Sequence, residues 1–493
     1  MSKNAKKNQM MESLSDIGQE AYSSAGENKR QNVEADDAEN GIKSMGNNVE
    51  NKMGTAPVGR LLASMAWPAI LSMTIAALYN IVDSIFVAMI SPKALTAVSL
   101  ILPVQILMIS IAVGSAIGVN SLIARRLGSR QFEEANKVAS TSIRIGVFNY
   151  LVFSVLGLLF SGSFMSLYST ESVIFGYGTD YLRIVTICCL FSMVELQLEK
   201  VLQATGNMVA PMLISLSGAV TNIILDPVLI FGLLGFPRLE VKGAAIATII
   251  GQGVSLLVAT YIVRRKENAV KISIKGFKVE GYIIKEIYAV GFPAMIMQAI
   301  SSVMLLGYNR VLTASAAAVA VLGVYVKLQS FVFMPLFGLN QGAMPIIGYN
   351  YGAKNRERMM EAYKKALMAA FIIMLAGFAM FQTIPASLLK LFSADEEMLK
   401  VGVPALKIIS LCFLPAAFDV ISSAMFQSTG HGMYSLFASL IRQLVGILPL
   451  AYILYNCMGL RASWFSIPLA EILGLTYTAI MFCNFYRKDV KNL

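Results

Sequence analysis

The sequence predicts an all-α integral membrane protein of about twelve transmembrane helices, arranged in two pseudo-symmetric lobes of six helices each. Three observations lead to this prediction: an apolar composition, a series of long apolar segments, and an internal repeat. Of the 493 residues, 56% are hydrophobic and 14% are charged, and the mean hydropathy is +0.65. Soluble domains carry about 25% charged residues, so this chain has about half of their charge. A transmembrane barrel would instead show short alternating strands.

Residues 1–56 are polar and of mixed charge, and they begin MSKNAKKNQMMESLSDIGQE. They lack the apolar core of a signal peptide and contain too few apolar side chains to bury a core of their own. We therefore predict a disordered cytoplasmic tail over 1–56. The amino-terminal lobe then covers 57–270 and the carboxyl-terminal lobe covers 271–493.

Twelve apolar segments, separated by charged or Gly- and Pro-rich breaks, are long enough to cross a hydrocarbon core of about 30 Å. The predicted spans are 61–90, 95–124, 138–161, 181–203, 209–235, 243–264, 286–313, 317–347, 363–385, 402–427, 433–457 and 462–486. Each half has six spans, an even number, so both halves enter the membrane from the same side.

Lys and Arg gather in the breaks after spans 2, 6 and 8 and in the segment after span 12. The break after span 6 holds Arg264, Arg265, Lys266, Lys271, Lys275 and Lys278. The opposite breaks are poor in basic residues, and SADEEMLK at 393–400 is acidic. Since cytoplasmic loops are enriched in Lys and Arg, we predict a multi-pass protein of a bacterial plasma membrane with both termini in the cytoplasm. The net charge of +11 is spread over several loops without a basic and aromatic patch, so we expect no nucleic-acid partner.

The two halves repeat each other at a fixed offset of 224 residues. The pairs at this offset include Gln105 with Gln329, Gly114 with Gly338, Gly118 with Gly342, and Gly128 with Gly352. LQATGN at 202–207 matches FQSTGH at 426–431 without a gap. Parallel repeats related by an axis along the membrane normal are typical of transporters that bind substrate between the halves.

Several kinds of chemistry are excluded by the residues that the sequence lacks. The single histidine, His431, rules out an HExxH motif or a His-based metal site, and no GxxxxGK[ST] motif for ATP binding occurs. The five cysteines lie in or beside apolar runs without a CxxC spacing, so we interpret them as small buried hydrophobes. We expect no cofactor, no metal other than Na⁺ at a cation site, and no enzymatic activity; transport would be driven by an ion gradient or a partner.

Buried polar groups are the candidates for function, because a carboxylate at the bilayer centre costs about 2.5–3.5 kcal/mol even on insertion scales. Asp83 lies in span 1 within LYNIVDSIFVAMI, and Asn222 and Asp226 lie in span 5 within TNIILDPVLIFG. The i,i+4 spacing of Asn222 and Asp226 places both side chains on one helical face. Pro227 removes a backbone donor and leaves a carbonyl near residue 223 as a further ligand. Thr248 in GAAIAT of span 6 adds a hydroxyl, and the small residues before it allow close packing.

Oxygen ligands of this kind suit Na⁺, and burial of a carboxylate favours its protonated form, which suits H⁺. Two plainer interpretations stay open. Asp226 fits a cap at a helix break with Pro227 as the first helical residue, and Asp83 fits an ion pair with a neighbouring helix.

Further polar residues are candidates for a substrate cavity. Glu195 and Glu199 are spaced i,i+4 on span 4, and Asp419 is the repeat equivalent of Glu195. Acids facing a central cavity would attract cationic substrates or carry a proton; the alternative is an ion pair near the cytoplasm. Three basic residues within spans of the second half are also candidates, namely Lys327 on span 8, Arg310 on span 7 and Arg442 on span 11. Such side chains usually extend to the interface, and Lys327 is the most interior of the three.

Taken together, these motifs resemble the multidrug and toxic compound extrusion (MATE) family. The stretches that carry the resemblance are YNIVDSIFVA, RRLGSR after span 2 with its echo FGLNQGAMPIIGYNYGAKN, LQATGN, TNIILDPVLIFG, GAAIATIIGQ and FQSTG. GTAPVGRLL and VYVKLQSFVFMPLFGLNQG are similar to the branch of MepA-type bacterial efflux pumps. Only the tail lies outside the resemblance.

The resemblance implies two six-helix lobes that open alternately to either side of the membrane and export cationic drugs or dyes in exchange for H⁺ or Na⁺. In relatives that keep a cation site in the amino-terminal lobe, its residues match Asp83, Asn222, Asp226 and Thr248 here. Another branch has an acid in the middle of span 7, where this chain has Gln298 instead. Gln298 and Lys327 complete the candidates for the substrate cavity, and we expect a monomer.

Ion entry from outside would then neutralise Asp83 and Asp226, change the packing of span 1, and release drug outward. The main rival function is a lipid-linked oligosaccharide flippase of the same broad superfamily, which would line its cavity with several cationic groups. A membrane-embedded enzyme and a channel are further alternatives.

Overall fold

The computed structural model describes residues 52–265, 269–273, 280–313, 315–392 and 394–493. Nearly all of the predicted tail, residues 1–51, lies outside the described residues. The last residues of the predicted tail include a single helical turn, α2 (Lys52–Thr55), which belongs to a different compact unit from Ala56–Leu493. All the other described helices lie in the unit Ala56–Leu493.

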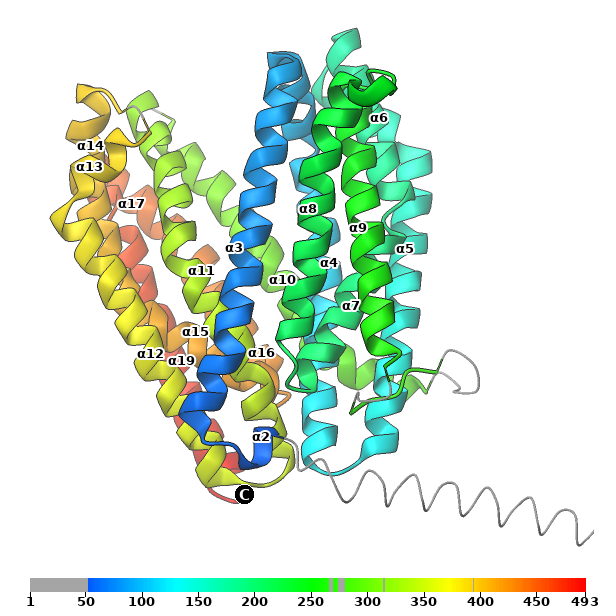
Figure 1. Cartoon of the computed structure of the whole chain (residues 1–493). Helices are drawn as coiled ribbons and strands as arrows, with labels where there is room; N and C mark the ends of the chain where they lie inside the picture. The colour runs from blue at the N-terminus through cyan, green and yellow to red at the C-terminus, as the bar shows by residue number, and fades with distance from the viewer. Residues whose placement is uncertain (1–51, 266–268, 274–279, 314, 393) are drawn as a thin grey trace, which may run out of the picture. The chain divides into compact units, whose positions relative to one another are not determined.

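Every regular element in the described residues is helical (Figure 1). The amino-terminal half contains α3 (Val58–Ile90), α4 (Pro92–Gly128), α5 (Phe132–Tyr168), α6 (Ser172–Ile187), α7 (Leu190–Ala204), α8 (Val209–Phe231), η1 (Leu233–Gly235) and α9 (Val241–Val263). The carboxyl-terminal half contains α10 (Gly281–Leu312), α11 (Ala316–Gly352), α12 (Arg356–Thr383), α13 (Pro385–Lys390), α14 (Glu396–Ile409), η2 (Ser410–Cys412), α15 (Phe413–Ser428), α16 (Gly432–Leu440), η3 (Ile441–Ile447), α17 (Leu448–Met458), α18 (Leu460–Ser463), α19 (Ser466–Phe485) and η4 (Tyr486–Val490).

Within the described part of the chain, eleven helices are long and apolar enough to cross a membrane. Consecutive helical segments that form one span, such as α14, η2 and α15 over Glu396–Ser428, are counted once. The pair α6 and α7 makes a twelfth span that is bent by 47°. The prediction of about twelve membrane-spanning helices is confirmed.

Most predicted span ends differ from the helix ends by several residues; α12, for example, begins at Arg356 rather than at Tyr363. Two differences change the path of the chain. The fourth span was expected as one helix over 181–203, but it bends between α6 and α7 at Cys188 and Cys189. The preceding stretch SGSFMSLY was expected as a loop, but α5 continues through it to Tyr168. Ser161 and Ser166 donate their hydroxyl protons to the carbonyls of Gly157 and Ser163, so these polar side chains are satisfied inside the helix.

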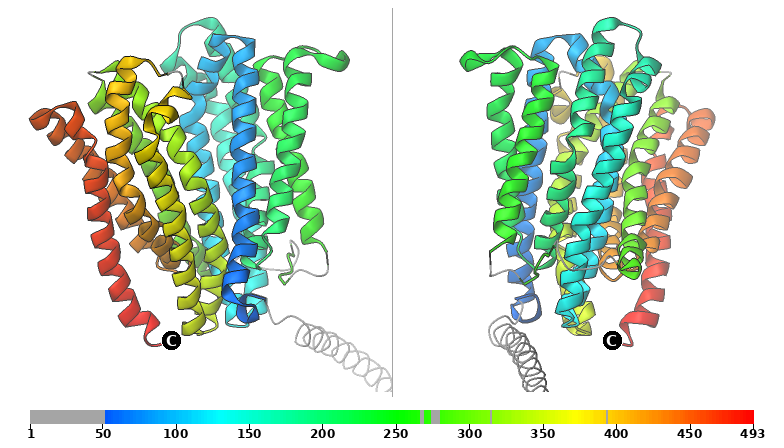
Figure 2. Two further views of the ribbon diagram at one scale, coloured as in Figure 1. Left: turned by 60° about the vertical axis from the view of Figure 1, so that its left-hand side comes forward. Right: turned by 90° about the vertical axis from the view of Figure 1, so that its right-hand side faces the viewer.

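The halves pack by equivalent contacts. In the amino-terminal half α3 packs on α8 and α4 on α5, and in the carboxyl-terminal half α10 packs on α16 and α11 on α12. Between the halves, α4 packs on α10 and α3 on α11 (Figures 1 and 2). Since α3 and α4 are the repeat equivalents of α10 and α11, these two contacts exchange under the repeat, as a pseudo-twofold axis requires.

The repeat glycines lie where the halves touch, along a contact that we call the seam. A Cβ atom on Gly118 of α4 would lie 2.1 Å from the carbonyl oxygen of Ile287 on α10. A Cβ atom on Gly342 of α11 would lie 2.9 Å from the backbone nitrogen of Ala66 on α3. Each glycine therefore lets two helix backbones from different halves come together where a side chain would hold them apart.

The turns that follow α4 and α11 also repeat. Arg130 and Lys354, at the 224-residue offset, both adopt left-handed backbone conformations with φ of 58° and 55°. The residue after each turn donates its N–H to an equivalent helix carbonyl: Gln131 to Arg126 at 2.8 Å and Asn355 to Asn350 at 2.9 Å. These turns lie at the end of the unit that also holds the C-terminus (Figures 1 and 2), and we call it the C-terminal end.

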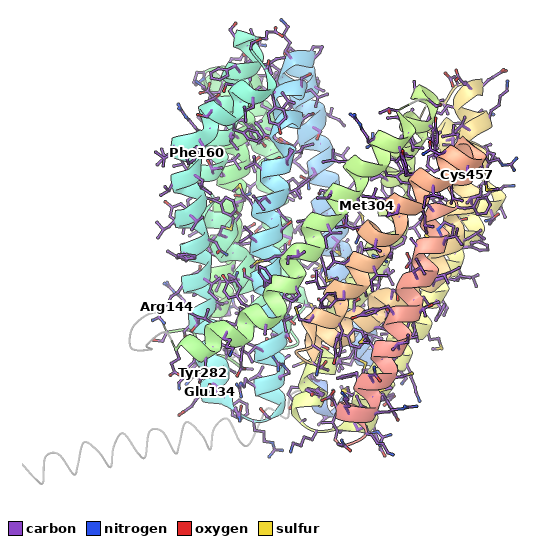
Figure 3. The ribbon with its side chains drawn as sticks, turned by 180° about the vertical axis from the view of Figure 1, so that it is seen from behind. Glu134, Arg144, Phe160, Tyr282, Met304 and Cys457 are labelled. Carbon is purple, nitrogen blue, oxygen red and sulfur yellow. The ribbon has the colours of Figure 1, made fainter. Side chains whose placement is uncertain are left out.

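The outer faces of the helices are apolar, as expected for surfaces in contact with lipid. Phe160 on α5 is 55% exposed and points away from the helix bundle (Figure 3). All five cysteines are free. Cys189 and Cys412 are buried as predicted, but Cys457 and Cys483 are exposed, because they lie on the outward side of their spans.

Candidate functional site

Three neighbouring helices of the amino-terminal half carry the predicted cation site. Asp83 lies seven residues before the end of α3, Asp226 five residues before the end of α8, and Thr248 seven residues after the start of α9. All three helix ends are at the end of the unit opposite the C-terminus (Figure 1). With a rise of about 1.5 Å per residue, the three side chains lie about 8–10 Å below those ends. Helices from distant parts of the sequence thus bring these side chains to one depth.

Asn222 connects two of the helices by hydrogen bonds. Its Nδ2 lies 3.3 Å from Oδ1 of Asp226, one turn along α8, and 3.4 Å from Oγ1 of Thr248 on α9. The shared face predicted for Asn222 and Asp226 is therefore observed. Thr248 donates its own proton to the carbonyl of Ala244 at 3.0 Å, which leaves its oxygen as an acceptor.

Small residues allow this close approach of α8 and α9. A Cβ atom on Gly251 would lie 2.8 Å from the carbonyl oxygen of Gly218, and one on Gly243 would lie 2.5 Å from that of Leu229. The packing role predicted for the small residues around Thr248 is present in the structure.

Three buried oxygens of this site receive no hydrogen bond from any described residue: Oδ1 of Asp83, Oδ1 of Asn222 and Oδ2 of Asp226. Buried acceptors without a donor are rare and costly in folded proteins. Asp226 itself is fully buried, and its carboxylate interacts electrostatically with that of Asp83. Two acids and an amide, each with a buried oxygen that lacks a hydrogen-bond donor, are a ligand set for a hard cation or a proton.

Tyr181 on α6 is a neighbour that was not among the predicted residues. It is buried and lies within electrostatic range of both Asp83 and Asp226. No local pattern distinguishes it from other tyrosines, because only the packing of α6 onto this region brings it there.

Pro227 does not break its helix. The helix α8 runs without interruption through Pro227 to Phe231 and ends at Gly232, which has a φ of 76°. Asp226 is therefore an interior helical residue, and its interpretation as a cap at a helix break is wrong. Pro227 still lacks the N–H that would bond the carbonyl of Ile223.

Both halves of the chain match a known protein family. The family model MatE matches residues 68–228 and 292–453, which are one segment of each half. The chain belongs to the MatE family. The resemblance inferred from the motifs is thereby confirmed.

Relatives of this MatE protein include the multidrug export protein MepA of two staphylococci. The protein of Staphylococcus haemolyticus (strain JCSC1435) is 27% identical over 82% of this chain and 88% of its own length. The protein of Staphylococcus aureus (strain bovine RF122 / ET3-1) is 26% identical over 85% of this chain and 92% of its own length.

Solved structures share the fold of this MatE protein. One is an outward-facing multidrug resistance MATE family transporter of the MOP superfamily, and another is a MOP superfamily transporter from Pyrococcus furiosus whose binding pocket is described as having reverse polarity. Both have a TM-score of 0.82 and 26% identity and cover 89% of this chain and 99% of their own. The predicted fold class, with two pseudo-symmetric lobes, is confirmed.

The predicted acids of the fourth span lie on α7. Glu195 and Glu199 are partly exposed, and Glu199 accepts a hydrogen bond of 2.6 Å from Gln203. Glu195 lies within electrostatic range of Tyr79 on α3. The neighbouring Lys200 is buried and donates to the amide oxygen of Gln203 at 2.8 Å. Two acids and a lysine therefore share one short helix segment of this MatE protein.

Asp419, the repeat equivalent of Glu195, lies in a different environment. It is 5% exposed on α15 and interacts with Glu471 of α19 and Arg442 of η3. Arg442 donates from Nη1 to Oε1 of Glu471 at 3.1 Å, so Arg442 is paired within the half and does not extend to the interface. Glu471 was not among the predicted residues, although an acid inside span 12 was a signal for it.

The other cavity candidates are not brought to these clusters. Gln298 on α10 and Lys327 on α11 are both exposed, and the amino group of Lys327 lies 5.7 Å from the ring centroid of Phe392. Arg310 is likewise exposed, near the end of α10. Their contribution to a substrate cavity stays a prediction.

Proposed function

We propose that this MatE protein is a secondary active multidrug efflux antiporter, which exports organic, mostly cationic, compounds in exchange for H⁺ or Na⁺. The observation that carries the proposal is the group of three buried acceptor oxygens on Asp83, Asn222 and Asp226 that no described residue satisfies. An ion or proton that enters this group would replace the missing donors. The same group would lose its charge on protonation, which makes it suited to coupling.

The export of drugs is supported by the relatives, which are multidrug export proteins and align with this chain over 88% and 92% of their own length. Glu195 and Glu199 add negative charge near α3, which favours a cationic substrate over an anionic one. Lys and Arg in the turns at the C-terminal end favour a cytoplasmic location of that end and hence of both termini. A monomer in a bacterial plasma membrane fits this arrangement.

The contacts between the halves support a direction for the proposed transport cycle. Polar links between the halves lie at the C-terminal end: Arg126 bonds Glu286, and Lys137 pairs with Glu280 at 3.0 Å. At the opposite end, the ion pair of Lys242 with Asp180 lies within one half. With the C-terminal end in the cytoplasm, this state is closed inward. Ion binding at Asp83 and Asp226 would then change the contact of α3 with α8 and release the drug outward.

Coupling requires that ion and drug favour different states, since a ligand shifts an equilibrium only by its differential affinity. Dye efflux from loaded bacterial cells that express the full chain, measured with and without an uncoupler, tests this. Asp83→Asn and Asp226→Asn should each abolish uncoupler-sensitive efflux while the protein stays folded in the membrane. Asp180→Asn, a partly exposed acid at the same end of the same half, is the matched control. Normal efflux by both site variants would contradict the proposal.

Whether H⁺ or Na⁺ is the coupling ion can be tested in proteoliposomes with an imposed pH gradient or an imposed Na⁺ gradient. Thr248→Val removes a neutral oxygen ligand and leaves both carboxylates in place. If Na⁺ is the coupling ion, this variant should need about tenfold more Na⁺, the cost of about 1.4 kcal/mol of ligand energy. If H⁺ is the coupling ion, the pH-driven rate should change little.

The flippase alternative gives a different result in the same vesicles. A flippase would move a fluorescent lipid-linked oligosaccharide without a gradient and would not accumulate dye against one. Gradient-driven dye transport without such lipid movement would exclude it, as it would a channel or an enzyme.

A further inference from the structure

A cavity of about 580 Å³ lies in the seam at the C-terminal end. Its walls come from both halves. Arg125, Arg126 and Ser129 line it from the end of α4 and the turn after it, and Tyr351 and Lys354 line it from the end of α11 and the equivalent turn. The cavity therefore lies where the two repeat-related turns face each other.

The walls of this cavity are set by backbone contacts that the repeat glycines permit. A Cβ atom on Gly128 would lie 1.9 Å from the carbonyl oxygen of Tyr349, and one on Gly352 would lie 2.0 Å from that of Arg125. The two helix ends thus touch directly beside the cavity. The backbone positions that carry its basic side chains are therefore held close together while the seam is closed.

The cavity has an excess of positive charge. Arg126 is neutralised by Glu286, with Nη2 at 3.0 Å and 2.9 Å from the two carboxylate oxygens. Arg125 and Lys354 form no ion pair with any described residue, and Arg125 donates only from Nε to the carbonyl of Ser121 at 3.4 Å. The chain ends at Leu493 in the same lining, and its terminal carboxylate offsets a second cation, so one positive charge of the three is in excess. A concave site with a net positive charge concentrates anions.

Arg125 reaches across the seam. Its Nη1 atom would lie 2.9 Å from a Cβ atom on Gly430, which belongs to the other half. The guanidinium group of one half thus lies against the turn of the other, and Lys354 of that other half lines the same cavity. An anion between them would contact both halves at once.

We propose that this cavity binds a phosphate-bearing anion that bridges Arg125 of one half and Lys354 of the other. Arginine offers planar paired donors and lysine a compact charge, and both groups recognise phosphate. Basic pockets between membrane helices near the bilayer surface take phosphate head groups. The anion is either the head group of an anionic phospholipid or free phosphate, and the chemistry at the protein is the same.

The repeat supplies a matched pair of variants. Lys354→Gln removes one charge from the cavity and keeps the side chain long. Arg130→Gln removes one charge at the repeat-equivalent position, with the same left-handed backbone, but Arg130 does not line the cavity. Both side chains are exposed, so we expect both variants to fold. A difference in anion binding between the two variants would then reflect the cavity.

The full chain is tested in two arms. In nanodiscs, native mass spectrometry counts bound phosphatidylglycerol against phosphatidylcholine. In detergent, thermal unfolding is followed with inorganic phosphate against chloride at constant ionic strength. The parent chain should bind an anion in at least one arm, and Lys354→Gln should weaken it about fivefold, the effect of one basic residue near a membrane surface. Arg130→Gln should retain the affinity of the parent.

Each outcome decides the proposal. Binding in the nanodisc arm alone identifies a lipid head group, and protection by phosphate in detergent identifies a small anion; both support the site. No binding in either arm, or equal losses in Lys354→Gln and Arg130→Gln, would overturn it. The test does not involve transport, so its result is independent of the proposed antiport.

Discussion

Lys200 on α7 donates a hydrogen bond of 2.6 Å from Nζ to Oε1 of Gln341 on α11, and so joins the two halves by a buried charge. The same ammonium group donates to Gln203 within its own half. Gln341 uses its own amide N–H to contact the sulfur of Met73 on α3 at 3.3 Å. One glutamine of the carboxyl-terminal half thus contacts two helices of the other half.

Two substitutions of Gln341 should act in opposite directions. Gln341→Glu places a carboxylate opposite the Lys200 ammonium group, so a hydrogen bond from a cation to a neutral amide becomes an ion pair with an added Coulomb attraction. We expect a higher midpoint of thermal unfolding and slower dye efflux, because the proposed transport cycle requires the seam to open. Gln341→Met removes the acceptor and should lower the midpoint by an amount that corresponds to about 1–3 kcal/mol.

The two variants control for each other, since both keep a side chain of similar length at the same site. Equal unfolding midpoints for Gln341→Glu and Gln341→Met would show that the contact with Lys200 does not hold the seam. The measurement is circular dichroism during heating, paired with efflux rates in cells.

The glycines of the seam predict a second result. Gly352→Ala would place a Cβ atom 2.0 Å from the carbonyl oxygen of Arg125, so the two helix ends would have to separate. We expect a loss of about 1–3 kcal/mol, as for overpacking of a filled core. Gly162→Ala is the control, because nothing lies within 4 Å of its new Cβ atom and alanine favours a helix. Thermal unfolding of both variants in the same detergent checks the difference, and equal midpoints would contradict it.

Much of this architecture could be predicted from sequence because it depends on local patterns. Span length and the offset of 224 are properties of the chain itself, and they predicted the twelve helices and the equivalence of Gly118 and Gly342. The spacing of Asn222 and Asp226 predicted their common face for the same reason.

The contacts between distant segments could not be predicted in this way. That Gly118 touches Ile287 depends on how α4 crosses α10, and no pattern within either segment encodes this crossing. Asp419 was grouped with Glu195 by the repeat, but the repeat specifies the backbone position and not the neighbours. Asp419 is surrounded by Glu471 of α19 and Arg442 of η3, whereas the charged neighbours of Glu195 are Glu199 and Lys200 on its own helix.

The buried group of Arg442, Glu471 and Asp419 predicts a third result. Arg442→Met leaves two buried acids without their cation, and breaking a buried ion pair costs about 3–5 kcal/mol. Arg442→Met combined with Glu471→Leu removes both charges of the pair and should recover most of that loss. The free energy of unfolding of the parent, single and double variants measures it. A double variant as unstable as Arg442→Met alone would contradict this role of the pair.

His431 predicts a dependence on pH. The pKa of His431 is lowered, mainly by burial, while Asp489 opposes the shift and Arg125 adds to it. The folded state therefore binds the proton less readily than the unfolded state. Stability is unaffected above the unfolded pKa near 6.5 and falls as the pH drops below it.

His431→Asn restores the residue of the first repeat, where Asn207 accepts a hydrogen bond of 3.0 Å from the N–H of Ala210 at the start of α8. His431 makes no such bond at the start of α16. The variant should therefore gain stability at all pH values, by about 1 kcal/mol for a cap, and should lose less stability than the parent between about pH 7 and pH 5. Unfolding midpoints at these two pH values give both effects separately. Parallel losses in parent and variant would mean that another group titrates, since the cap raises both values equally and only the imidazole changes with pH.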